Sequence, residues 1–85
     1  MKTFEYVITD KLGIHARPAG MLVKEAKQFE SRIVIRKDGK EAEASRLMAL
    51  MGLGVKCGDK IVVTAEGKDE ETALKEIEAF IKKNL

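Results

Sequence analysis

The sequence predicts an α+β domain in two layers, an antiparallel sheet with helices on one of its faces. Stretches of strand-like and helix-like pattern follow one another in the order βαββαβα. An Asp-Gly pair between two of the strand-like stretches indicates a tight hairpin. The chain has 85 residues, of which 45% are hydrophobic and 35% charged. This composition suits one soluble globular domain spanning residues 1–85 and argues against disorder.

The first two elements are a strand and a helix. Residues 3–8 alternate in character and place aromatic and aliphatic side chains on one face, which is typical of a strand. After a break, apolar residues recur at helical spacing over residues 16–27, so this helix should bury one stripe. Pro18 falls in its first turn, where a missing N–H does little harm.

A hairpin and a short helix follow. A strand is predicted at residues 32–36, and Asp38-Gly39 turns the chain into a short third strand at about residues 40–44. A helix should then run from about residue 46 to residue 53 and end at Gly54, because glycine is favoured just beyond a helix C-terminus.

The last two elements are a strand and a long helix. Residues 61–66 form a β-branched run after a Gly-Asp turn, which predicts the fourth strand. The final helix should cover residues 70–84, with an apolar stripe from Ala73 to Ile81. Its acidic start and basic end suit the helix dipole.

Composition also restricts the function. The formal net charge is only +2, so bulk charge does not indicate a nucleic-acid binder. No apolar stretch is long enough to cross a membrane and no basic-then-apolar leader is visible, so we expect no membrane insertion and a cytoplasmic location. The single cysteine, Cys57, cannot form an internal disulfide, which fits a reducing compartment. We expect it to be an inert thiol.

The stretch Gly13-Ile14-His15-Ala16-Arg17-Pro18-Ala19-Gly20 holds the only histidine. His15 should lie where a loop meets the start of a helix, and the first N–H groups of a helix form a ready anion site. A neutral imidazole is a competent nucleophile near neutral pH. The guanidinium of Arg17 suits phosphate oxygens. The plain alternative is that His15 is only a helix-capping or surface residue, and the spacing alone leaves that alternative open.

Residues 13–19 resemble the active-site signature of HPr, the histidine-containing phosphocarrier of the bacterial sugar phosphotransferase system. The resemblance covers essentially the whole chain, and the Asp38-Gly39 turn falls where HPr has one. It implies an open-faced β-sandwich, a four-stranded antiparallel sheet covered on one face by three helices. It also implies that enzyme I phosphorylates Nδ1 of His15, that Arg17 contacts the phosphoryl group, and that IIA domains of sugar permeases receive it. No metal or dissociable cofactor is expected.

The short helix over residues 46–53 is rich in large apolar side chains. Leu50 and Leu53 share one face and should enter the core, while another face is either core or a docking surface. The HPr resemblance favours docking, and methionines suit a surface that fits several partners. The predicted docking residues are Met21, Lys24, Lys27, Arg46, Leu47, Met48 and Met51. The lysines would rim this surface and steer acidic partners, although a merely solvated face explains them equally well.

One branch of the HPr family carries a regulatory serine at the start of this helix, where a dedicated kinase modifies it and a catabolite-repression regulator then binds. The matching position here is Arg46, and Ser45 precedes it. This departure argues against such a kinase and regulator as partners. We expect Ser45 to be either the helix N-cap, with its oxygen accepting a backbone N–H, or a regulatory phosphosite shifted by one residue.

Two other classes compete with a phosphoryl carrier. A regulatory HPr-like paralogue acting by protein–protein interaction needs neither His15 nor Arg17, and both are present. A ferredoxin-like nucleic-acid-binding domain displays aromatic residues on its sheet, whereas most aromatic residues here fall on apolar stripes or element ends. The sequence holds no Walker loop, metal-ligand cluster or second histidine, so we expect a carrier rather than an enzyme, acting as a monomer.

Overall fold

The computed structural model describes residues 1–85 and has the predicted order of elements. The elements are β1 (Lys2–Val7), α1 (Ala16–Ala26), β2 (Arg32–Lys37), β3 (Lys40–Glu43), α2 (Leu47–Gly52), β4 (Lys60–Glu66) and α3 (Glu70–Asn84). The range predicted for the last helix is confirmed in full. The helix predicted over residues 46–53 is one residue shorter at each end, and the first strand begins and ends one residue earlier than predicted.

The four strands form one antiparallel sheet in the order β1-β4-β2-β3. Strand β4 therefore lies between β1 and β2, and Val63 at its centre faces Phe4 on one side and Ile35 on the other. Ile35 and Val63 are fully buried, as the period-two alternation of a half-buried strand requires.

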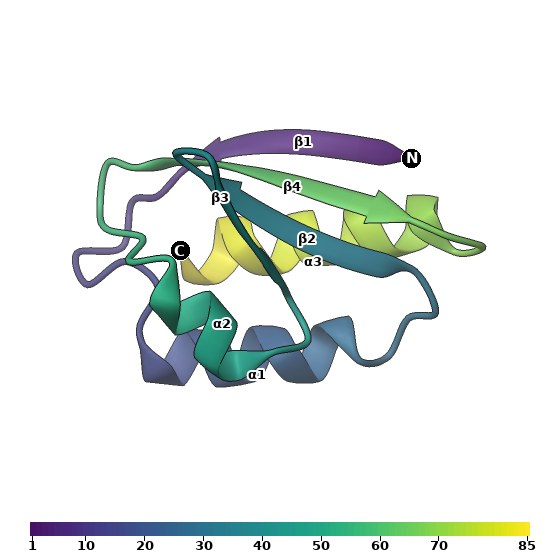
Figure 1. The fold of residues 1–85 in the computed structure, drawn as a ribbon, viewed down its shortest axis with the longest axis horizontal. Coiled ribbons are helices and arrows are strands. Elements are labelled where there is room, and N and C mark those ends of the chain that lie inside the picture. Colours follow the sequence, from purple (N-terminus) through teal and green to yellow (C-terminus); the bar gives the residue numbers. More distant parts are fainter.

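The three helices cover one face of this sheet, and the other face is open (Figure 1). A single cluster of 19 buried apolar residues joins the sheet to the helices. It includes Leu22 of α1, Leu50 of α2 and Ile77 of α3, which confirms the predicted buried stripes. The fold class, including the open-faced arrangement that the family resemblance implied, is confirmed. No helix is both long and apolar enough to cross a membrane.

The two ends of the molecule carry different connections (Figure 1). The loop from β1 to α1, the loop from α2 to β4 and the C-terminal end of α3 meet at one end, where α1 begins. The connections from α1 to β2 and from β4 to α3 meet at the opposite end. The predicted nucleophile therefore lies at the first of these two ends.

Candidate functional site

The loop that leads into α1 is held by the C-terminal end of α3. The backbone N–H groups of Thr9 and Asp10 both donate to the carbonyl oxygen of Leu85, at 2.6 and 2.7 Å. The hydroxyl of Thr9 donates to the same oxygen at 3.0 Å. Leu85 itself is buried in the core. The segment in front of His15 is therefore fixed by the core rather than left as a free surface loop.

The same loop packs closely against the connection from α2 to β4. The N–H of Ile14 donates to the carbonyl of Val55 at 3.1 Å. Gly13 has a φ of +67°, and a Cβ there would overlap the carbonyl oxygen of Val55 and lie 2.7 Å from the Cα of Lys56. Glycine is required here both for its backbone conformation and for this close approach.

A lysine and an aspartate anchor the connection from α2 to β4, against which Gly13 packs. Lys37 donates to the carbonyl of Gly54 at 2.9 Å and lies 3.1 Å from the carboxylate of Asp59. Asp59 also accepts the backbone N–H of Lys56 at 2.8 Å. This N–H and the Lys37 ammonium hold the pKa of Asp59 below its ordinary value of 3.8. The hairpin from β2 to β3 thus braces the loop on which the site rests.

His15 is the N-cap residue of α1, in extended conformation, and its side chain is 36% exposed. Its carbonyl accepts the N–H of Ala19 at 3.0 Å, while its imidazole makes no capping hydrogen bond. Because Pro18 has no N–H, the unpaired backbone donors of the first turn are those of Ala16 and Arg17. The predicted position at the start of a helix is confirmed, and two free N–H groups follow the ring directly.

Asp10 is a site residue that the sequence analysis missed. Its Oδ2 lies 3.5 Å from Nε2 of His15, which assigns Nε2 to the side of the ring that faces the carboxylate. The sequence pattern predicts only a break between the first strand and the first helix, and Asp10 lies in that break. No periodic pattern relates the two residues, so only the path of the loop brings them together.

Arg17 is exposed, and its guanidinium forms no ion pair and no hydrogen bond within the chain. Its side chain is free to reach an anion at the start of α1. No cluster of three or more His, Cys, Asp or Glu side chains is placed to hold a metal ion. The exposed Cys57 approaches the carbonyl of Thr9 with its sulfur at 3.7 Å.

The helix α2 divides its apolar residues between core and surface. Leu50 and Leu53 are buried, as predicted. Leu47, Met48 and Met51 remain 39%, 79% and 40% exposed, so they do not fill the core. A helix that leaves large apolar side chains in solvent offers a surface for another protein.

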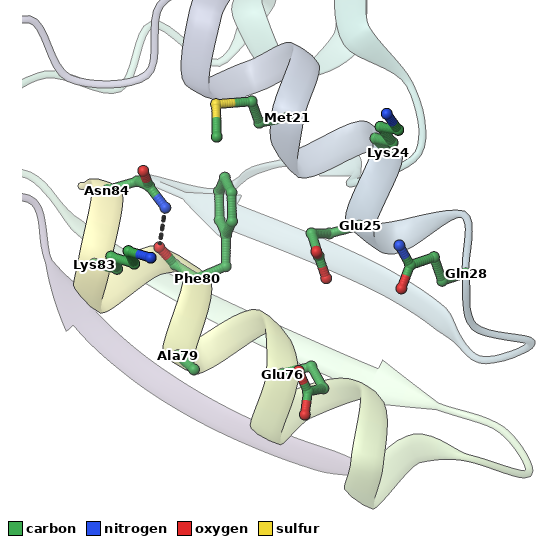
Figure 2. Close-up of a pocket in the computed structure, with 9 residues that line it drawn as sticks. All are labelled: Met21, Lys24, Glu25, Gln28, Glu76, Ala79, Phe80, Lys83 and Asn84. Carbon is green, nitrogen blue, oxygen red and sulfur yellow. Dashed lines mark hydrogen bonds between the residues drawn. The ribbon is translucent and has the colours of Figure 1, made fainter.

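The other predicted docking residues lie on two sides of α1. Met21 and Lys24 line the groove between α1 and α3, where Phe80 forms part of the opposite wall (Figure 2). Lys27 instead lines a hollow that also contains Ser45, just before α2. The structure therefore places Lys27 beside the start of α2 and Met21 in the groove between α1 and α3.

The prediction that Ser45 caps α2 is wrong. The N-cap is Arg46, and no side chain caps the helix. The helix begins at Leu47, so the hydroxyl of Ser45 stands one residue too early to reach the N–H groups of the first turn. The guanidinium of Arg46 pairs with the carboxylate of Glu43 at 3.2 Å.

Comparison with known proteins gives a consistent family. The family model PTS-HPr, described as the PTS HPr component phosphorylation site, matches residues 2–83. The phosphocarrier protein HPr of Mycoplasma genitalium is 44% identical over 85 residues, covering 99% of this chain and 97% of that protein. The HPr-like protein Crh of Halalkalibacterium halodurans is 45% identical over 73 residues, covering 86% and 87%. The crystal structure of HPr-C-His from Thermoanaerobacter tengcongensis has a TM-score of 0.92 at 41% identity and covers 96% of this chain and 92% of that chain.

Proposed function

The chain belongs to the PTS-HPr family, and from that premise we propose that His15 accepts a phosphoryl group from phosphorylated enzyme I and passes it to IIA domains of sugar permeases. Proteins of this family are phosphocarriers rather than catalysts.

One observation carries it: the only imidazole of the chain is partly exposed at the start of α1, directly before two unpaired backbone N–H groups. A phosphoryl group bound to that ring would lie near these donors and near the positive end of the helix dipole. Because phosphoryl transfer has a loose transition state, positioning and charge stabilisation are the main requirements.

Nδ1 is the proposed acceptor atom. Nε2 lies beside the carboxylate of Asp10, at 3.5 Å, so a negatively charged phosphoryl group would be repelled from that nitrogen. Nδ1 has no such neighbour. The free guanidinium of Arg17 would contact the phosphoryl oxygens there and help to orient the partner proteins.

The exposed apolar face of α2 is the proposed docking surface. Leu47, Met48 and Met51 supply the apolar contacts, and Lys24, Lys27 and Arg46 supply positive charge for acidic partners. Met21 would take part only if a partner also reached the groove between α1 and α3. A carrier must leave each partner quickly, so we propose a cytoplasmic monomer with small, short-lived interfaces.

The direct test is incubation with enzyme I and phosphoenolpyruvate carrying a labelled phosphate. The label should transfer to the chain and be acid-labile and alkali-stable, as expected of a phosphohistidine. His15→Ala should take up no label and should keep its fold, because the imidazole makes no capping bond. Labelling of His15→Ala at the wild-type level would overturn the proposal.

Arg17→Ala tests the second residue of the site. Its side chain has no partner within the chain, so the fold should remain unchanged while transfer slows by roughly a hundredfold, the usual effect of losing one charge-stabilising contact. Arg17→Lys keeps the charge but loses the planar fork, so its transfer rate should lie between those of wild type and Arg17→Ala. Rates equal to wild type in both directions would remove Arg17 from the mechanism.

A regulatory role is the second candidate, favoured by the 45% identity to an HPr-like protein Crh. On this reading the docking face acts by binding alone, with transfer chemistry absent. A serine kinase of the family type should modify the chain poorly, because Arg46 stands at the regulatory position and is paired with Glu43. Mass spectrometry that finds efficient ATP-dependent phosphorylation of Ser45, together with no uptake of label by His15, would favour the regulatory role.

A further inference from the structure

The carboxylate of Asp10 has an unusual environment. Its Oδ2, the oxygen nearest to His15, is shielded from solvent and accepts no hydrogen bond. The side chain as a whole is 34% exposed, so only one of its oxygens is deprived of water. A carboxylate oxygen that loses its hydration without gaining a donor destabilises the fold. Such an unsatisfied acceptor in a native structure needs an explanation.

Backbone hydrogen bonds hold Asp10 in this position. Its N–H donates to the carbonyl of Leu85 at 2.7 Å, and its carbonyl accepts the N–H of Gly13 at 3.0 Å. Both ends of this short loop are therefore fixed. The carboxylate is held against the ring by the path of the backbone, and not by any bond that the side chain itself makes.

We propose that Asp10 is a positioning residue for phosphoryl transfer: its carboxylate accepts the Nε2–H of His15 and so leaves the Nδ1 lone pair free as the nucleophile. This inference rests on the proposed function. A neutral imidazole carries one proton, and an acceptor beside one nitrogen favours the tautomer with the proton on that nitrogen. The 3.5 Å contact is longer than a good hydrogen bond, as is common before the reacting group is bound.

The same contact stabilises the charge that the ring gains. When a phosphorylated donor protein reacts, the bond between phosphorus and the donor atom breaks, and the Nδ1 electron pair forms the new N–P bond. The proton on Nε2 stays in place, so the ring becomes positively charged beside the Asp10 carboxylate. In onward transfer a nucleophilic atom of the acceptor protein forms the new bond to phosphorus as the N–P bond breaks, the electron pair returns to Nδ1 and the ring is neutral again. Asp10 should therefore speed the phosphorylation of His15 more than the removal of the phosphoryl group, because it stabilises the charge that the first step creates and the second removes.

Two variants of Asp10 distinguish the effect of its negative charge from the effect of its acceptor oxygen. Asp10→Asn keeps the size and an acceptor oxygen but removes the charge, whereas Asp10→Ala removes both. The side chain accepts no hydrogen bond and its one ion pair is with His15, so both variants should fold. The matched control is Glu66→Gln, which removes an exposed and unpaired carboxylate at the opposite end of the molecule, where β4 ends (Figure 1).

Transfer rates give the first readout, with enzyme I and phosphoenolpyruvate in the forward direction and back-transfer in the other. Asp10→Ala should slow forward transfer by about tenfold or more, as when the carboxylate partner of a metal-bound histidine is removed, and should slow back-transfer less. Asp10→Asn should lose less, and Glu66→Gln should stay within about twofold of wild type. Normal phosphorylation of wild type together with unchanged rates in Asp10→Ala would overturn the inference while leaving the proposed function intact.

Nitrogen-15 NMR of the His15 ring gives a second readout that needs no partner protein. In the wild-type chain the neutral ring should carry its proton on Nε2, and Asp10→Ala should shift the ring toward a mixture of tautomers. A merely structural role for Asp10 would not move this signature. A wild-type ring protonated on Nδ1, or a tautomer unchanged in Asp10→Ala, would contradict the proposal even if enzyme I proved unable to phosphorylate the chain.

Discussion

Two aspartates, each in front of a long helix, have opposite environments. Asp69 precedes α3 and accepts hydrogen bonds from the N–H of Glu30, the N–H of Ser31 and the hydroxyl of Ser31. Asp10 precedes α1 and turns an unsatisfied oxygen toward His15. The Asp69 carboxylate ties the connection between α1 and β2 to the start of α3, whereas the Asp10 carboxylate ties nothing together.

This difference indicates that the end of the molecule with Asp69 serves stability, whereas the end with Asp10 and His15 serves phosphoryl transfer. A carboxylate whose two oxygens both accept hydrogen bonds stabilises the fold. A carboxylate with an unsatisfied oxygen beside a nucleophile does not, and such a strained arrangement is typical of a functional site. Substitutions around Asp69 should therefore change stability and spare transfer. Substitutions around His15 and Asp10 should change transfer, and change stability only where they disturb the loop.

A matched pair of glycines gives the largest expected effects. Gly67→Ala would place a Cβ 2.7 Å from the Cα of Ser31 at a φ of +150°. Gly13→Ala would place one into the carbonyl of Val55 at a φ of +67°. Each should lower the free energy of unfolding by about 2–4 kcal/mol, from backbone strain and overlap.

The two glycine variants should differ in phosphoryl transfer. Gly13→Ala displaces the loop that carries His15, so its transfer should fall by roughly a hundredfold, as for a reacting group moved by about an ångström. Gly67→Ala should transfer at the wild-type rate below its melting temperature. Chemical denaturation and a transfer assay on both variants check this, and equal loss of transfer in both would abolish the distinction between the two ends.

Asp69→Asn should have the next largest effect on stability. The Ser31 hydroxyl, followed by the backbone N–H groups of Glu30 and Ser31, holds the pKa of Asp69 below its ordinary value of 3.8. Removing the charge weakens these bonds, and the melting temperature should fall by roughly 5 °C or more at neutral pH, with transfer unchanged.

The pH dependence of that loss follows from the direction of the pKa shift. Because the folded-state pKa lies below the unfolded value, the stabilisation is fully present above pH 3.8 and disappears as the pH falls through the lower folded-state pKa. The difference in melting temperature between wild type and Asp69→Asn should therefore shrink in that acid range. A difference that stays constant to lower pH would show that the charge of Asp69 does not supply the stability.

Met48→Glu should have the smallest effect on the fold, and it tests whether the surface of α2 binds partner proteins. Met48 is 79% exposed, so its replacement should leave the melting temperature nearly unchanged while partner affinity falls by about tenfold. Thr72→Glu is the control, because it adds the same charge at an exposed position of α3 outside the groove that Met21 and Lys24 line. Calorimetric titration with enzyme I separates the two variants. A large loss of stability in Met48→Glu would place that residue in the core instead.

The sequence pattern predicted the features that depend on residues close together in the chain. The apolar stripe of α3 fixed its range because burial at Ala73, Ile77 and Ile81 repeats with the period of a helix. The position of His15 also followed from its neighbours, since Pro18 is favoured in a first turn.

What the sequence could not predict depends on where one segment meets another. Asp10 reaches His15 only because its backbone is hydrogen-bonded to Leu85 and to Gly13. Leu85 is far from Asp10 in the sequence, so no local pattern predicts this contact. The capping error at Ser45 has a similar origin, since a shift of one residue in the start of α2 decides which side chain can cap it.

The most direct test of the account is nitrogen-15 NMR of the chain after phosphorylation by enzyme I and phosphoenolpyruvate. We expect a phosphoryl group on Nδ1 of His15 and a proton on Nε2, facing Asp10. A phosphoryl group on Nε2, or on any residue other than His15, would contradict it.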